Sequence, residues 1–190
     1  MRMRLFWLAT AVAVLLPGVG RADNPKTIAG PSPASAPKPT PAAAVVPFEK
    51  LLPFLPETPA GWTSEKPNGS TTDVIAFTLS TATRTYQKGD DDNAPVATVT
   101  IIDAGGHQGY FDTATSSWKF TKETPEGYDK GVEIDGLPGY EHFNKTINSS
   151  SLCVITAKRY FIQIELTNQD PKELREWMKK IDLKKLGELK

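Results

Sequence analysis

The chain has 190 residues, with 22 basic and 22 acidic side chains, 16 prolines and a single cysteine. This length suits one ordinary domain rather than an array of domains. The balanced charge excludes the strongly basic class of protein that binds nucleic acid without sequence specificity, and one cysteine cannot form a disulfide within the chain.

The first 22 residues have the pattern of a signal peptide. Arg2 and Arg4 form a basic head, and the apolar run Leu5–Leu16 follows it. Gly20 and Ala22 place small residues at the positions that a signal peptidase reads. This predicts cleavage before Asp23 and a periplasmic or secreted location. The apolar run is well short of the roughly 20 residues that cross a bilayer, so the mature chain should have no transmembrane segment. Cleavage would leave 19 basic against 22 acidic residues, which again disfavours a nucleic-acid partner.

Residues 23–46 are predicted to be a disordered linker rich in proline and alanine. Seven prolines lie between Asp23 and Pro47, and large apolar side chains are almost absent before Val45. Such a segment cannot bury enough surface to fold, and frequent proline makes it a semi-stiff spacer. Residues 47–190 then form one domain.

The first part of this domain predicts one short helix and a β-rich stretch. A helix is expected from Pro47 to about Leu52, and Pro53 should end or kink it. Residues 74–86 have β character with a change of apolar phase, which predicts a bulge or two shorter strands. The acidic run at residues 89–93 is expected to be a solvated turn, and a strand from Val96 should end at Asp103.

The middle of the domain predicts a helix and two hairpins. The helix covers roughly Gln108–Trp118. Asp135–Gly136 is a favoured two-residue turn and should join strands on either side of it. A second hairpin should join alternating strands near residues 152–157 and 160–167, although its turn lacks the Gly or Asn that tight turns prefer.

An amphipathic helix is predicted near the end of the chain. Leu174, Trp177, Met178 and Ile181 recur at the spacing of one helix face, and Asp170 begins a capping pattern. Together these elements predict an α+β domain: an antiparallel β-sheet of about six strands with two to three helices packed on it, including this C-terminal helix.

Seven short motifs lie along the predicted domain: Leu51–Pro53, Pro59–Trp62, Ala82–Tyr86, Val99–Asp103, Asp135–Tyr140, Arg159–Ile162 and Ile181–Leu186. Together they resemble a group of small uncharacterised exported bacterial proteins. The order of elements is also similar, more loosely, to the Mog1/PsbP-like α/β sandwich, which implies a role in binding or assembly and brings no catalytic residue.

The main catalytic or metal-binding candidate is the segment Asp103-Ala-Gly-Gly-His107. With His142 nearby, Asp103 and His107 would provide the oxygen and nitrogen ligands that zinc accepts. This arrangement would indicate a metal-binding protein or a metal-assisted hydrolase. Spacing alone does not bring the three together, and the alternative is that Asp103 closes a turn while His107 faces solvent.

The absence of nucleophile, phosphate-loop and zinc-helix motifs favours a non-catalytic protein without a cofactor. We expect an exported binding or assembly module whose partner is an envelope protein or a small ligand. Four aromatic residues are candidates for lining its binding groove: Trp62, Tyr110, Trp118 and Tyr140. Cys153 is expected to be a buried, inert thiol within a strand.

Overall fold

The structure is a computed structural model that describes residues 44–74 and 77–190. The predicted signal peptide and residues 23–43 of the predicted linker lie outside the described residues. Val46 was expected to belong to the linker, yet its side chain is buried in the core. Its backbone N–H donates to Oδ2 of Asp103 at 2.7 Å. The core therefore takes in apolar surface that precedes Pro47.

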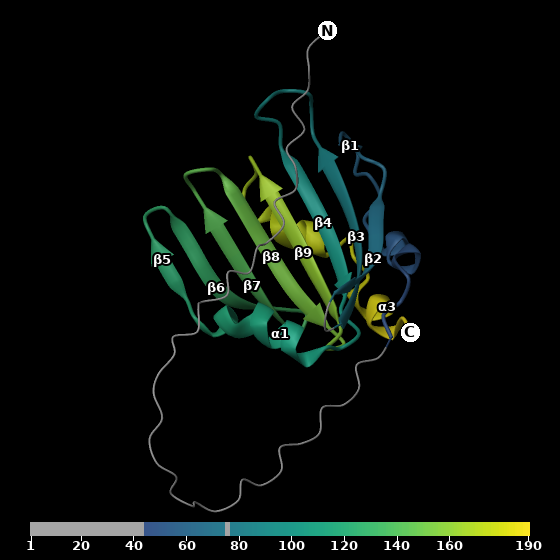
Figure 1. The fold of residues 1–190 in the computed structure, drawn as a ribbon. Coiled ribbons are helices and arrows are strands. Elements are labelled where there is room, and N and C mark those ends of the chain that lie inside the picture. The colour runs from purple at the N-terminus through teal and green to yellow at the C-terminus, as the bar shows by residue number, and fades with distance from the viewer. Residues whose placement is uncertain (1–43, 75–76) are drawn as a thin grey trace, which may run out of the picture. The chain divides into compact units, whose positions relative to one another are not determined.

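In the part of the chain that the structure describes, nine strands form one antiparallel sheet, so the prediction of about six strands is wrong. Their order is β1-β3-β4-β9-β8-β7-β6-β5, and β2 also pairs with β3 (Figure 1). The missed strands β1, β2 and β5 are short or polar and largely exposed, so their sequences show no apolar alternation. The strands are β1 (Thr63–Ser64), β2 (Asn68–Val74), β3 (Phe77–Gln87), β4 (Val96–Asp103), β5 (Lys122–Thr124), β6 (Gly127–Ile134), β7 (Leu137–Asn144), β8 (Ser149–Thr156) and β9 (Tyr160–Thr167).

Strand β3 runs without a bulge, contrary to one reading of its apolar pattern. Its register with β4 continues without a break from Ser80↔Asp103 to Gln87↔Val96. The apolar phase changes because the two ends of β3 contact different clusters. Leu79 packs on one face of the sheet, whereas Ala82 and Tyr86 belong to the core on the other.

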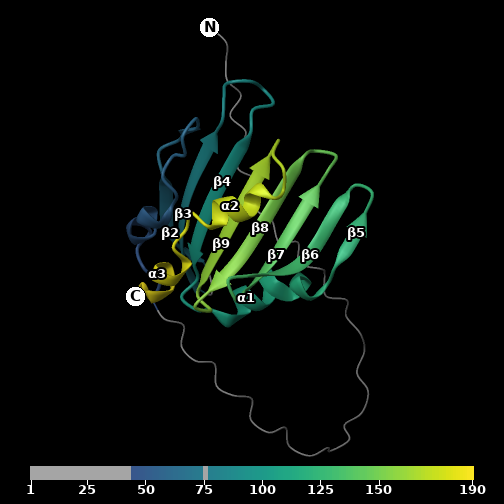
Figure 2. The same cartoon turned by 180° about the vertical axis from the view of Figure 1, so that it is seen from behind.

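One face of the sheet, here called the core face, carries the main hydrophobic core (Figure 2). It is covered by α2 (Glu173–Met178), by α3 (Leu183–Glu188) and by two 3-10 turns, η1 (Phe48–Lys50) and η2 (Leu52–Phe54). These helices are short, so strand dominates the described chain and the predicted balance of a small sheet with packed helices is wrong.

The apolar face predicted for the C-terminal helix is confirmed. Leu174, Trp177, Met178 and Ile181 are all at least 96% buried. The helix itself is shorter than expected, because it ends at Met178 and α3 starts separately after Asp182. Asp182 caps α3 by accepting a hydrogen bond from the N–H of Lys185 at 2.9 Å.

The predicted helix at Pro47–Leu52 is wrong in type. The segment forms η1 and η2 instead, and Pro53 lies inside η2 rather than after a helix. Proline fits there because its fixed φ suits the first turn of a helix, where its missing N–H has no partner to lose. Leu51 and Leu55 are buried in the main core as a helix would have placed them.

On the opposite face, here called the polar face, the described residues cover only one end. There α1 (Gln108–Thr115) and η3 (Ser116–Lys119) lie across the ends of the strands (Figure 1). They confirm the helix predicted at Gln108–Trp118. Their apolar side chains pack with Ile155 and Phe161 in a second, smaller cluster.

Both of the predicted hairpin turns contain non-glycine residues with positive φ. Asp135 and Gly136 have φ of 50° and 79°, and Ile134 pairs with Leu137, so the predicted two-residue turn is confirmed. At the β8–β9 hairpin, which is also confirmed, Ala157 and Lys158 have φ of 53° and 52°. Side chains other than glycine rarely adopt this region without strain.

Replacing Lys158 by glycine should raise the free energy of unfolding by about 1 kcal/mol, because glycine adopts a left-handed conformation without strain. Part of this gain is offset, since glycine increases the conformational entropy of the unfolded chain. Urea denaturation measures this change. Gly136→Ala is the matched opposite, since it introduces a Cβ at a φ of 79° and should destabilise the β6–β7 hairpin. If Lys158→Gly were destabilising, strain in this turn would not be the controlling effect.

Candidate functional site

Two of the four aromatic candidates pack against the two hydrophobic clusters. Trp62 packs edge-on against Trp177 of α2, with ring centroids 5.2 Å apart, and is partly buried against the main core. Tyr110 lies in the second cluster, in edge contact with Phe111 and Phe161. They lie on opposite faces of the sheet and do not line one shared surface.

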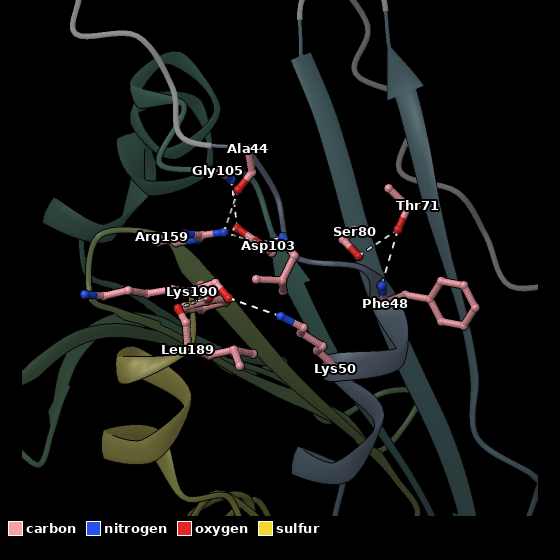
Figure 3. A network of polar contacts seen from close by, with 12 residues as sticks. Ala44, Phe48, Lys50, Thr71, Ser80, Asp103, Gly105, Arg159, Leu189 and Lys190 are labelled. Atoms are coloured by element: carbon pink, nitrogen blue, oxygen red, sulfur yellow. Dashed lines mark hydrogen bonds and ion pairs between the residues drawn. The ribbon is translucent and has the colours of Figure 1, made fainter.

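Asp103 is fully buried and forms a dense ionic contact with Arg159 (Figure 3). Arg159 Nε donates to Oδ1 at 2.9 Å and Nη2 donates to Oδ2 at 2.7 Å. The carboxylate also accepts the backbone N–H groups of Val46 and Gly105. Arg159 further donates to the carbonyl oxygen of Ala44. This cluster joins the N-terminal segment to the ends of β4 and β9, and it leaves Asp103 no role as a metal ligand.

The hydrogen bond to Asp103 raises the pKa of Arg159, which keeps the guanidinium charged. Close by, Lys50 Nζ donates to the backbone carbonyl of Lys190, and Phe48 N–H donates to the Thr71 hydroxyl (Figure 3). These contacts fix both ends of the described chain to one corner of the sheet. The corner is therefore a structural element.

The three candidate metal ligands are not brought together. His107 precedes α1, and its ring lies 4.7 Å from that of Phe77. His142 is on β7 and binds Asp129 instead, while Asp103 is held by Arg159. Among residues 44–74 and 77–190, no group of three or more His, Cys, Asp or Glu side chains could hold a metal ion.

The polar face of β6 and β7 does gather three of the seven candidates around a carboxylate. His142 Nδ1 lies 2.6 Å from Asp129 Oδ1, across the pair Asp129↔His142. Burial raises the pKa of Tyr140, as do the charge of Asp129 and a hydrogen bond to it. Trp118 of η3 is nearly parallel to Tyr140, with ring centroids 6.4 Å apart and planes 8° apart. His142, Tyr140 and Trp118 therefore form one site with Asp129.

The register places further polar residues in the row of His142. Lys122 pairs with Asp129 on one side, Ser151 pairs with His142, and Glu165 of β9 pairs with Ser151. Because directly paired residues project from the same face of a sheet, these side chains share the polar face. A small cavity of about 150 Å³ opens beside them, lined in part by Lys122, Asp129, His142 and Asn144.

A larger groove of about 640 Å³ is lined by Trp118, where η3 meets the C-terminal half of β6 and the N-terminal end of β7. Gly131, which lines it, cannot be replaced freely, because a Cβ there would collide with the carbonyl oxygen of Trp118. This close approach lets η3 lie against β6 and brings the Trp118 ring beside Tyr140.

Asp129 was missed by sequence reasoning, although the signal that identifies it was present. A two-residue turn at Asp135–Gly136 pairs Ile134 with Leu137, and counting back along both strands pairs Asp129 with His142. A carboxylate and an imidazole directly opposite each other on one face should interact. Lys122 and Ser151 required knowledge of β5 and of the β7–β8 register.

A second buried carboxylate lies on the core face of β7. Glu141 is 2% exposed and contacts Arg175 of α2 at 2.7 Å and Lys130 of β6 at 3.3 Å. The Tyr128 hydroxyl donates to its Oε1 at 2.5 Å. Burial alone would raise the pKa of Glu141, but the hydrogen bond from Tyr128 and the charge of Arg175 outweigh it, so the pKa is lowered.

Cys153 is a free thiol, and burial raises its pKa to about 12. It is therefore protonated at neutral pH, as expected of an inert thiol.

Among the described residues, no helix combines the length and apolar character that crossing a bilayer requires. Comparison of the chain with protein-family models, with curated proteins and with solved structures found no match.

Proposed function

We propose that the protein is an exported, non-catalytic binding module whose polar face holds an uncharged, hydroxyl-rich ligand, a glycan chain. The observation that carries this proposal is the hydrogen-bonded pair His142–Asp129 on the same face as the nearly parallel rings of Tyr140 and Trp118. Ligand sites in proteins commonly combine apolar or aromatic surface with a few polar groups that set orientation. This site has both, on rigid strands.

The polar groups of the site suit sugar hydroxyls, which both donate and accept hydrogen bonds. A carboxylate only accepts, so the Nδ1–H group of His142 donates a hydrogen bond to Asp129, and Nε2 is left as an acceptor when the imidazole is neutral. Ser151 adds a hydroxyl in the same row. The aromatic surface of Trp118 and Tyr140 offers a platform for the apolar face of a sugar ring.

The charges around the site favour a neutral ligand over a polyanion. Lys122 is paired in register with Asp129, so the cation that lines the small cavity faces an anion. Glu165 adds a negative charge in the same row. A phosphate-rich or sulfated polymer would need an excess of positive charge here.

The alternative function is that of a hydrolase, because Asp129, His142 and Ser151 lie side by side in the order carboxylate, imidazole, hydroxyl of a serine triad. Acyl transfer also requires free N–H donors aimed at the developing oxyanion. Here β7 and β8 each pair with a strand on both sides, so their backbone N–H groups are used within the sheet. Glu165 next to Ser151 would also oppose an oxyanion. The geometry supports binding.

Binding should be measured by calorimetry with a panel of soluble neutral oligosaccharides and their sulfated counterparts. We expect at least one neutral oligosaccharide to bind, and Trp118→Ala to weaken it about tenfold, because loss of an aromatic contact costs about 1 kcal/mol or more. His142→Ala should weaken it as well.

Thr98→Ala is the matched control, because Thr98 lies on the polar face of β4, which β9 and β8 separate from His142 on β7. Its affinity should equal that of the parent. The proposal fails if no neutral oligosaccharide binds, if sulfated ligands bind better, or if Thr98→Ala and Trp118→Ala have the same effect.

The same proposal places the protein in the periplasm or outside the cell, supported by the basic and apolar pattern of the first 22 residues. Intact-mass spectrometry of the protein recovered from the cell envelope or the medium should give the mass of a chain that starts at Asp23. A chain that keeps Met1 in the cytoplasm would contradict export.

A further inference from the structure

The outer edge of β6 is only half covered. β5 pairs with Gly127, Tyr128 and Asp129, and no strand of the described residues pairs with the same edge at residues 130–134. On its other side β6 pairs with β7 along its whole length. An uncovered edge offers unpaired backbone groups that can pair with another strand.

The parity of the hairpin shows which backbone groups are open. The pair Ile134↔Leu137 closes a two-residue turn, so the backbone groups of residues 134, 132 and 130 point toward β7. Those of Gly131 and Glu133 point outward, and both residues are exposed. The groove of about 640 Å³ lies directly beside them. Two N–H and two carbonyl groups are thus presented to open space.

We propose that this edge pairs antiparallel with the same edge of a second copy of the chain, which makes one continuous sheet across a two-fold axis. Such pairing is self-complementary when it is centred on Val132. Gly131 then lies opposite Glu133 of the second copy, and Glu133 lies opposite its Gly131. Both are hydrogen-bonded pairs, so the two chains exchange four backbone hydrogen bonds.

The neighbouring registers are worse. A register centred on Glu133 sets two carboxylates directly opposite each other, which is destabilising. A register centred on Gly131 opposes Glu133 to Asp129, whose outward groups are already paired with Lys122. Within the open segment, residues 130–134, the register centred on Val132 pairs all the open backbone groups and sets no two carboxylates directly opposite each other, and this favours a second copy as the occupant.

The pairing has a consequence for the polar face. Because an antiparallel two-fold of this kind keeps equivalent faces on the same side, both His142 sites lie on one side of the extended sheet. Two sites on one rigid sheet can engage one long ligand, so the dimer increases avidity without any new ligand contact. The dimer itself does not depend on what the sites bind.

The register is tested by cysteine cross-linking in the full expressed protein carrying Cys153→Ser. Val132 of one chain lies opposite Val132 of the other in a non-hydrogen-bonded pair. The two Cα atoms of such a pair lie about 4.5 Å apart, which is within the range for a disulfide. Val132→Cys should therefore give a covalent dimer on mild oxidation. Ile134→Cys is the matched control: residue 134 faces Lys130 of the second copy, so this variant should give little covalent dimer.

A second pair of variants tests the pairing by light scattering. Glu133→Pro removes an outward N–H that β7 does not use, so it should convert a dimer to a monomer and leave the fold intact by circular dichroism. Glu133→Gln keeps the N–H and should remain a dimer. A monomeric parent protein, or equal cross-linking of the Val132→Cys and Ile134→Cys variants, would overturn the proposal.

Discussion

Replacing Arg159 by alanine should lower the free energy of unfolding by about 3–5 kcal/mol. Asp103 is fully buried and receives two hydrogen bonds from this guanidinium, so the variant leaves a carboxylate in the interior without its counter-ion. The backbone N–H groups of Val46 and Gly105 satisfy part of its hydrogen-bonding capacity but do not neutralise its charge. Urea denaturation at neutral pH measures the loss.

Lys158→Ala is the control, because it removes a positive charge from the adjacent, exposed position in the same turn. Its effect should be under about 0.5 kcal/mol. Adding Asp103→Asn to Arg159→Ala should restore part of the loss, since the buried charge is removed. If Arg159→Ala costs no more than Lys158→Ala, the ionic cluster does not hold the N-terminal segment to the sheet.

The second large effect is acid sensitivity that depends on Glu141. Its pKa is lower in the folded protein than the ordinary value of 4.5, so the unfolded chain takes up the proton first as pH falls. The stabilisation is therefore complete above pH 4.5 and is lost as the pH drops through the lowered folded pKa. Glu141→Gln should cost about 1.5–3 kcal/mol at neutral pH, because charge-assisted hydrogen bonds are lost.

The diagnostic readout is the slope of stability against pH. Between pH 5 and pH 3, the parent protein should lose more free energy of unfolding than Glu141→Gln does. Glu133→Gln removes an exposed carboxylate from the neighbouring strand β6 and should follow the parent profile. A Glu141→Gln profile parallel to that of the parent would show that this carboxylate is not stabilised in its charged form.

Sequence patterns over a few neighbouring residues predicted the elements that are determined by interactions between those residues. The turn at Asp135–Gly136, the end of β4 at Asp103 and the buried face of α2 follow from turn chemistry and periodicity, and all are confirmed. Strands β2 and β5 could not be found in this way, because exposed polar edges carry no apolar pattern. Their pairing with β3 and β6 determines them instead.

The site shows the same division. Composition does not show which face of a sheet an aromatic residue occupies. The sequence therefore groups Trp62 with Trp118, although Trp62 packs against the main core on the other face. The partner of Asp103 is Arg159, 56 residues away in another turn, and spacing in the sequence cannot reveal it. The pairing of Asp129 with His142 could have been predicted, because the confirmed turn at Asp135–Gly136 determines the register of the two strands.

The central proposal, that the polar face of β6 and β7 binds a neutral glycan, is tested most directly by nuclear magnetic resonance of the backbone amides during titration with an oligosaccharide identified by calorimetry. The proposal predicts shifts at Asp129, Tyr140 and His142 and at the indole N–H of Trp118, with Trp177 on the core face unchanged. Shifts confined to other parts of the molecule, or none at saturating ligand, would contradict it.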